Sequence, residues 1–150
     1  MTTKQYLGQI NRLDKAIDNK LEEIDRLREM ATSISISADP NKVQTSGEQD
    51  KLGEAIAKIV DLERETYELV QRYIFIRTKI INQIDELAET EDYELVYKYF
   101  VNLNTKKGIA QEMHWSEKTI ERKLDIAMRR FETRFGKKYL RKHKVTDVTY

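Results

Sequence analysis

The chain of 150 residues has no cysteine, one proline and five glycines. Without cysteine there are no disulfides and no thiolate metal sites, and a reducing cytoplasm is the matching compartment. No apolar run approaches the roughly 18 residues of a membrane span, and the N-terminus lacks the apolar core of a signal peptide. We therefore expect a cytoplasmic protein with no membrane partner.

Charged residues are abundant, at 35% of the chain against 39% apolar residues. With so few prolines and glycines, this balance favours long, solvent-exposed helices over a β-sandwich or an α/β fold. The charge is divided unevenly, because residues 101–150 hold 13 Lys/Arg against 6 Asp/Glu, whereas residues 1–100 hold 14 against 20. This asymmetry predicts a polyanionic partner for the C-terminal part, with a solvated helical surface as the alternative.

Two long segments carry apolar side chains at steps of three and four residues, the period of an amphipathic helix. Residues 3–31 predict a first helix with this stripe: Leu7, Ile10, Leu13, Ile17, Leu21, Ile24 and Leu27. Its stripe is as narrow as a coiled-coil seam, so this helix needs a partner. Residues 48–89 predict a second helix, which Thr66 weakens, with this stripe: Leu52, Ile56, Ile59, Leu62, Leu69, Tyr73, Ile76, Ile80, Ile84 and Leu87.

The two helices are predicted to fold back as a long antiparallel, coiled-coil-like hairpin over residues 1–89, a module for oligomerisation or partner binding. Residues 32–47 would form its loop, and the alternation of Ile34 and Ile36 with serine leaves a short strand as an alternative there. Because the second helix is longer than the first, its excess at residues 73–87 needs another partner. We expect a second subunit and hence a homodimer, with a core inside the chain as the alternative.

Residues 106–128 carry the pattern of a helix-turn-helix. A first helix from about Thr105 to Met113 is followed by a three-residue turn, and a second helix begins after the N-cap Ser116. These side chains would pack the two helices together, with alanine at their closest approach: Ile109, Ala110, Met113, Ile120, Leu124 and Ala127. His114 occupies a turn position where glycine is common, because left-handed backbone angles cost other residues about 1 kcal/mol.

The helix-turn-helix domain is expected to span residues 90–136, and a basic tail would follow over residues 137–150. A helix over residues 93–100 would cover the motif from behind with its aromatic and aliphatic side chains. Trp115 is expected to pack the turn into the core. The fold class is therefore all-α, a helical hairpin followed by a C-terminal helix-turn-helix.

Residues 95–131 resemble region 4 of bacterial sigma factors of the sigma-70 class, the helix-turn-helix that recognises promoters. The resemblance rests on these residues at the family's spacing: Ile109, Ala110, Ser116, Thr119, Ile120, Leu124, Ala127 and Met128. With the hairpin and its runs Asp50-Lys51-Leu52 and Ile59-Val60-Asp61-Leu62-Glu63, nearly the whole chain is similar to phage-encoded late transcription regulators of the ArpU and RinA type. That resemblance implies an activator of late genes that binds promoter DNA and acts with host RNA polymerase.

The start of the second helix of such a motif meets base edges in the major groove. Four positions would read bases: Glu117, Lys118, Glu121 and Arg122. Arginine and lysine donate to guanine O6 and N7, and glutamate accepts from cytosine N4. Residues around this face would hold phosphates: Thr105, Lys106, Lys107, Thr119, Lys123, Arg129 and Arg130. A solvated helix face is the alternative reading of these positions.

Support for an enzyme is almost absent, and we expect no catalytic residue, metal or cofactor. The two histidines, His114 and His143, have no carboxylate pair at ligand spacing beside them. The expected partner is double-stranded DNA, bound by a sequence-specific transcription regulator. The alternative is a phage assembly or adaptor protein, similar to a small terminase subunit, which binds another protein through the coiled coil.

Overall fold

The computed structural model describes residues 1–37 and 46–140, and the regular structure in these ranges is entirely helical. In chain order the helices are α1 (Thr3–Leu7), α2 (Gln9–Ser37), α3 (Ser46–Asp85), α4 (Glu91–Val96), the π-helix η1 (Tyr97–Val101), α5 (Lys106–Met113), α6 (Glu117–Phe135) and the 3₁₀-helix η2 (Gly136–Lys138). The predicted all-α class is confirmed. Of the predicted tail, residues 141–150 lie outside the described residues.

The chain divides into two compact units whose limits differ from the predicted domains. Unit 1 combines Met1–Asn11 with the chain from Ile76 onward, and unit 2 is Arg12–Phe75. Both ends of the segment predicted as one hairpin module, residues 1–89, therefore pack with the C-terminal helices. Sequence periodicity misses this division because it records that a face is apolar and not which element covers it.

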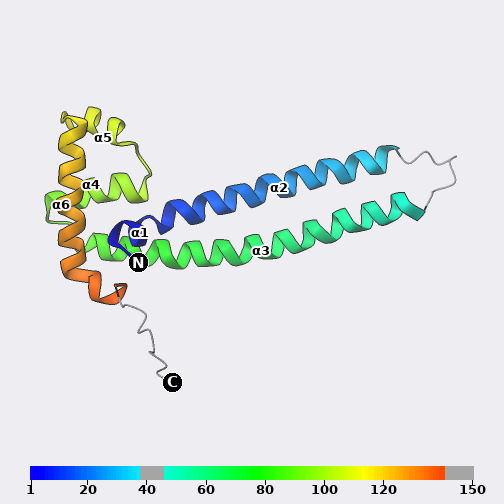
Figure 1. Cartoon of the computed structure of the whole chain (residues 1–150), viewed down its shortest axis with the longest axis horizontal. Coiled ribbons are helices and arrows are strands. Elements are labelled where there is room, and N and C mark those ends of the chain that lie inside the picture. Colours follow the sequence, from blue (N-terminus) through cyan, green and yellow to red (C-terminus); the bar gives the residue numbers. More distant parts are fainter. Residues whose placement is uncertain (38–45, 141–150) are drawn as a thin grey trace, which may run out of the picture. The chain divides into compact units, whose positions relative to one another are not determined.

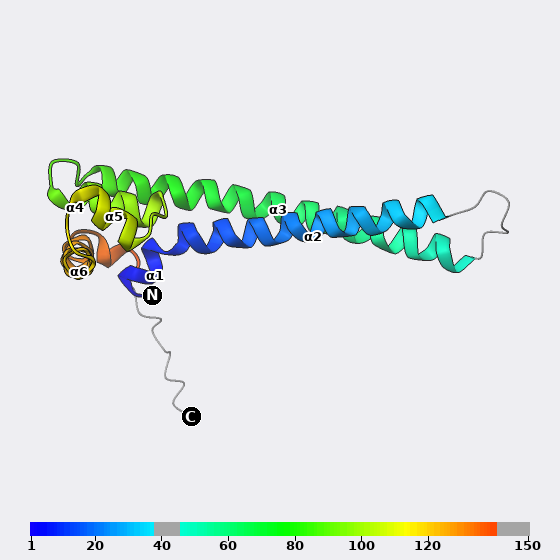
Figure 2. The same cartoon turned by 90° about the horizontal axis from the view of Figure 1, so that it is seen from above.

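In unit 2, α2 and α3 lie side by side and run antiparallel (Figures 1 and 2), so the predicted helix pair is confirmed. Two ion pairs of 2.6 Å join the helices, Lys20 with Glu65 and Arg28 with Glu63. Apolar side chains buried along this pair include Ile24, Leu27 and Ala55.

Thr66 is buried on α3, at the position that weakens the predicted stripe. Its hydroxyl donates to the Leu62 carbonyl of its own helix at 2.6 Å. This bond satisfies the hydroxyl without a partner from α2, so the polar residue is tolerated among apolar ones.

The first predicted helix, residues 3–31, is in fact divided at Gly8. The Gly8 N–H donates to the Lys4 carbonyl oxygen at 2.9 Å, and a Cβ at this position would lie 2.8 Å from the same oxygen. α1 therefore ends at Leu7, and both Tyr6 and Leu7 are buried in unit 1. The prediction of one unbroken helix is wrong because the glycine permits a close backbone approach that the apolar period does not reveal.

The predicted loop over residues 32–47 is too long at both ends, since α2 continues to Ser37 and α3 starts at Ser46. Within α2 the Thr32 hydroxyl donates to the Arg28 carbonyl at 2.8 Å, so its hydrogen bond is made inside the helix rather than in a loop. The isoleucine–serine alternation is part of α2, so the strand alternative is wrong. Residues 38–45 of the predicted loop lie outside the described residues.

The C-terminal part of α3 is buried inside unit 1. Ile80 and Ile84 are fully buried and Leu87, just past the end of the helix, is 6% exposed. The sequence predicts that residues 73–87 need a partner beyond the first helix. For these three residues that partner is a core within the chain, the alternative to a second subunit. α3 ends at Asp85 rather than at residue 89, and a turn follows in which the Leu87 N–H donates to the Ile84 carbonyl at 2.8 Å.

The helix predicted over residues 93–100 starts earlier, at Glu91, and changes to a π-helix after Val96. The Asn102 N–H donates to the Tyr97 carbonyl at 3.0 Å, and Leu103 takes a left-handed φ of 57°. These features end η1 and start the turn before α5. α6 contacts α1, α4 and α5, and Figure 2 views it nearly end-on beside α4 and α5.

Candidate nucleic-acid interface

α5, α6 and the turn between them have the boundaries that the sequence predicts. Thr105 caps α5 by accepting from the Gly108 N–H at 3.0 Å, and Ser116 caps α6 by accepting from the Thr119 N–H at 3.2 Å. α5 ends at Met113 and α6 starts at Glu117, so three residues form the turn. These caps use side chains within three residues of the N–H groups they satisfy, which is why local sequence predicts them.

His114 takes the left-handed conformation that the missing glycine led us to expect, with φ 57° and ψ 37°. The Trp115 N–H then donates to the Ala110 carbonyl at 3.0 Å and closes the end of α5. Left-handed backbone angles at a non-glycine residue cost about 1 kcal/mol, and the chain reverses direction here at that cost. The reversal sets the direction in which α6 leaves the turn.

The faces predicted to pack α5 and α6 together are buried. Ile109, Ile120 and Ala127 have no exposed surface, Leu124 is 2% exposed and Ala110 is 5% exposed. Met113 is partly buried. Because this face of α6 is fixed inward, the opposite face is presented to solvent.

All four predicted base-reading residues are exposed, but they lie in two separate rows of the free surface of α6. Lys118 and Arg122 belong to one row, which Asp125 and Arg129 continue at steps of three and four residues along the helix. Among the described residues, the cations of this row have no ion-pair partner. Positive charge is therefore available along the middle of the exposed face.

Glu117 and Glu121 lie on the edge nearer α5. The Nζ of Lys106, on α5, is 3.3 Å from Oε1 of Glu121, so one of the four predicted base readers already has a cationic partner. The ion pair joins the first turn of α5 to the second turn of α6. Glu117 has no ion pair among the described residues.

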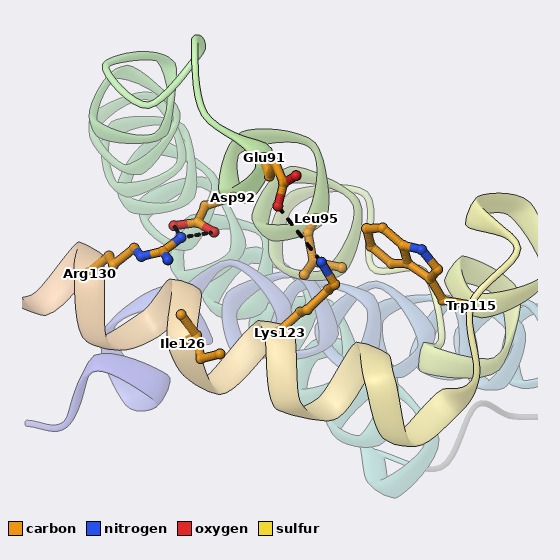
Figure 3. Close-up of a pocket in the computed structure, with 7 residues that line it drawn as sticks. All are labelled: Glu91, Asp92, Leu95, Trp115, Lys123, Ile126 and Arg130. Atoms are coloured by element: carbon orange, nitrogen blue, oxygen red, sulfur yellow. Dashed lines mark hydrogen bonds and ion pairs between the residues drawn. The ribbon is translucent and has the colours of Figure 1, made fainter.

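Two of the predicted phosphate-contacting residues turn instead toward the start of α4 (Figure 3). Nη1 of Arg130 lies 3.1 Å from both carboxylate oxygens of Asp92, a carboxylate that is only 9% exposed. The Nζ of Lys123 lies 3.7 Å from Glu91 and 4.2 Å from the centroid of the Trp115 ring. Both cations thus bind the acids of the first turn of α4, where the helix dipole also favours negative charge.

A hollow of about 70 Å³ lies among these groups, and Leu95 and Ile126 complete its walls (Figure 3). A volume of this size holds a few water molecules and no larger ligand. The hollow is thus a gap at a junction between α4 and α6, held closed by two ion pairs. Trp115, which the sequence predicts to pack the turn into the core, is partly buried and lines this hollow.

The other residues predicted to contact phosphate differ in whether their side chains already have a partner within the chain. Lys107 and Arg129 are exposed and have no ion-pair partner among the described residues. The Thr119 hydroxyl lies 2.8 Å from that of Ser116, and the Thr105 hydroxyl is occupied as the cap of α5. The geometry therefore leaves Lys107 and Arg129 as the unpaired cations of the predicted phosphate set.

Lys98 ties α5 to the helix behind it. Its ammonium group forms ion pairs with Glu112 on α5 and, at 3.3 Å, with Glu94 on α4. The hydrogen bond to Glu112 raises the pKa of Lys98 above its ordinary value. The spacing of Glu94 and Lys98 is that of an i,i+4 helix pair, but the sequence offers no signal for the contact with Glu112, because a turn of unknown direction lies between η1 and α5.

The N-terminal residues brace the other end of α6. The Thr3 hydroxyl donates to Oε2 of Glu132 at 2.7 Å and lies 2.9 Å from the Tyr139 hydroxyl. Tyr6 stacks on Tyr139, with ring centroids 4.1 Å apart, and its hydroxyl donates to Gln83 at 2.7 Å. Burial raises the pKa of both tyrosines.

Neither of two other kinds of site occurs in the described ranges. No group of three or more histidine, cysteine or acidic side chains there could hold a metal ion. No helix in residues 1–37 or 46–140 combines the length and the apolar character that crossing a membrane requires. Comparisons with protein families, with characterised proteins and with solved structures found nothing that matches this chain.

Proposed function

We propose that the chain is a sequence-specific DNA-binding transcription regulator of the cytoplasm. The observation that carries the proposal is the row of cations along the exposed face of α6, Lys118, Arg122 and Arg129, which have no ion-pair partner among the described residues. α6 begins just after the three-residue turn in which His114 is left-handed. A helix held in this way, with a short helix packed across its inner face, has the form that enters the DNA major groove.

Arg122 and Lys118 read guanine through O6 and N7, because both side chains are exposed and free of ion pairs among the described residues. Glu117 accepts from cytosine N4. The ion pair with Lys106 already occupies the Glu121 carboxylate, so Glu121 contributes less to base recognition than the other three residues. Lys107 and Arg129 hold phosphates on either side and supply the salt-dependent share of affinity.

In this proposal Lys123 and Arg130 act mainly as structural residues. Their ion pairs with Glu91 and Asp92 hold α6 on α4 and thereby fix the angle of the reading face. The target would be a promoter, as the likeness to sigma region 4 and to phage late regulators implies, with host RNA polymerase as a further partner and late-gene activation as the outcome.

The test begins with selection of a binding site from random double-stranded DNA by the full chain. Arg122→Ala should then weaken binding to the selected site by about 1–3 kcal/mol and leave binding to unrelated DNA nearly unchanged. Lys107→Ala should weaken binding to all sequences alike and lower the slope of log K against log salt by about one.

Arg26→Ala is the matched control, because Arg26 is an exposed arginine of unit 2 with no ion-pair partner among the described residues. It should change neither affinity nor salt slope. Equal losses on every sequence with Arg122→Ala, or no DNA binding at low salt, would reject sequence-specific regulation.

A second candidate is an assembly or adaptor protein that works through unit 2. The observation in its favour is a set of apolar side chains of α3 that face solvent, among them Tyr67 and Phe75, about two thirds exposed. A chain that selects no DNA sequence but binds another protein through unit 2 would support this candidate.

A further inference from the structure

The helix α3 of unit 2 has a second apolar row besides the one that faces α2. Ile56, Val60, Tyr67 and Ile74 are between 50% and 66% exposed. Large apolar side chains at this exposure on one helix face are a feature of interaction surfaces, whereas scattered ones are ordinary. We call this row the outer seam.

The outer seam has the spacing of a coiled coil. Val60, Tyr67 and Ile74 follow one another at intervals of seven residues. Together with Ile56, Glu63 and Val70 they form one row whose steps alternate between four and three residues. Each residue of this row comes directly after a residue of the row that packs on α2. One residue is about 100° around a helix, so α3 presents two neighbouring apolar faces and α2 covers one.

We propose that a second copy of this chain covers the outer seam, with the two α3 helices packed side by side and antiparallel. The two hairpins then form a four-helix bundle with a two-fold axis near residue 65. The seam suits its own copy because a two-fold axis brings its apolar ends together. In this register Ile56 faces Ile74 of the second copy, and Val60 faces Val70 of the second copy.

Charge decides the direction of the two helices. A parallel pair in register would place Glu63 opposite Glu63 of the second copy, two like charges in one layer. The antiparallel pair places Glu63 opposite Tyr67 of the second copy instead, where the phenol can donate to the carboxylate. The same register leaves Arg28, the present partner of Glu63 on α2, free to keep its ion pair.

The outer seam supplies the apolar centre of the area that a stable dimer needs. With about 150–250 Å² for a whole aromatic side chain, the two-thirds exposed Tyr67 offers roughly 130 Å². Half-exposed Ile56, Val60 and Ile74 extend this apolar area, and flanking polar groups complete the contact. A specific interface of standard size buries about 800 Å² per partner.

This surface differs from the one that the sequence suggested for a second subunit. Ile80, Ile84 and Leu87 are buried within their own chain, so the contact moves toward the N-terminus along α3. The inference depends only on unit 2 and stands whether or not the chain binds DNA.

The first test is the molar mass of the full chain by light scattering over a range of concentrations. The wild type should have twice the 17.8 kDa of one chain. Ile74→Lys should weaken association on the order of 100-fold, because it places an unpaired charge against Ile56 of the second copy at two points of each dimer. The control Glu68→Lys introduces the same side chain at an exposed position of α3 outside the seam and should remain dimeric.

Circular dichroism separates loss of the dimer from loss of the fold, since Ile74 is 52% exposed and its replacement removes no fully buried residue. A helical, monomeric Ile74→Lys beside a dimeric Glu68→Lys supports the proposal. A monomeric wild type, or an Ile74→Lys variant as dimeric as the wild type, overturns it.

The second test uses the absence of cysteine to fix orientation. Ile56→Cys and Ile74→Cys chains, refolded together and oxidised, should give a covalent heterodimer, whereas each variant alone should give almost none. Cross-linking of each variant with itself would show a parallel pair and overturn the antiparallel register. A dimer that yields no cross-link in any combination would place the contact on another surface and overturn the proposal.

Discussion

Asp92→Ala should lower the free energy of unfolding of unit 1 by about 2 kcal/mol, although it removes a carboxylate from a highly charged protein. Asp92 is 9% exposed, and both its oxygens lie 3.1 Å from Nη1 of Arg130. Hydrogen bonds between charged groups contribute about 1.5–3 kcal/mol, and a carboxylate in the first turn of a helix adds about 0.3–1 kcal/mol. Because Arg130 is 63% exposed and recovers water when its partner is removed, we take the lower part of the combined range.

The neighbouring carboxylate provides the control. Glu91 is 83% exposed and lies 3.7 Å from Lys123, so solvent screens its ion pair and Glu91→Ala should change stability much less. Urea unfolding followed by the fluorescence of Trp115, the one tryptophan of the chain, measures both variants. At a typical slope of 1–3 kcal/mol per molar urea, Asp92→Ala should move the midpoint by about 1 M.

The reverse change is expected to cost more. Arg130→Ala leaves the nearly buried carboxylate of Asp92 without its cation, whereas Asp92→Ala leaves an arginine that solvent can reach. The double variant should therefore be no less stable than Arg130→Ala alone. Equal effects of Asp92→Ala and Glu91→Ala would refute the reasoning, as would an Arg130→Ala variant that keeps full stability and loses only salt-dependent DNA binding.

Three further predictions concern the core, the tyrosine cluster and the turn. Ile80→Ala should cost about 2–5 kcal/mol in urea unfolding because Ile80 is fully buried, whereas Ile74→Ala should cost clearly less in the monomeric state because Ile74 is 52% exposed. Stability should fall as pH rises above about 10, because burial raises the pKa of Tyr6 and Tyr139, so the unfolded chain loses these protons first. Urea midpoints between pH 9 and 11 test this, and a double Tyr→Phe variant with the same pH dependence as the wild type would contradict it. His114→Gly should stay within about 1 kcal/mol of the wild type, since relief of left-handed strain is offset by a more flexible unfolded chain, while His114→Val should lose about 1–2 kcal/mol. A valine variant as stable as the glycine variant in thermal melts would rule out this account of the turn.

The sequence by itself determined the features that depend on neighbours within a few residues. The steps of three and four predicted α2 and α3, because an amphipathic helix needs only its own apolar period to be recognised. Ser116 predicted the start of α6, since a cap bonds N–H groups of the next turn. The unusual His114 marked the left-handed position for the same reason, because the conformation of a turn is set by its own residues.

Only the tertiary structure decided which elements those faces and charges meet. Ile80 and Ile84 continue the stripe of α3 without a change of period, yet they pack into unit 1 rather than along the helix pair. Arg130 looks in sequence like Arg129, one residue away, but Asp92 pairs with the first, and no acid in the described residues pairs with the second. Arg130 and Asp92 lie 38 residues apart in the sequence, and the turns between their helices bring them together. Local periodicity carries no information about that placement, so the division of α6 into structural and free cations emerged from the fold alone.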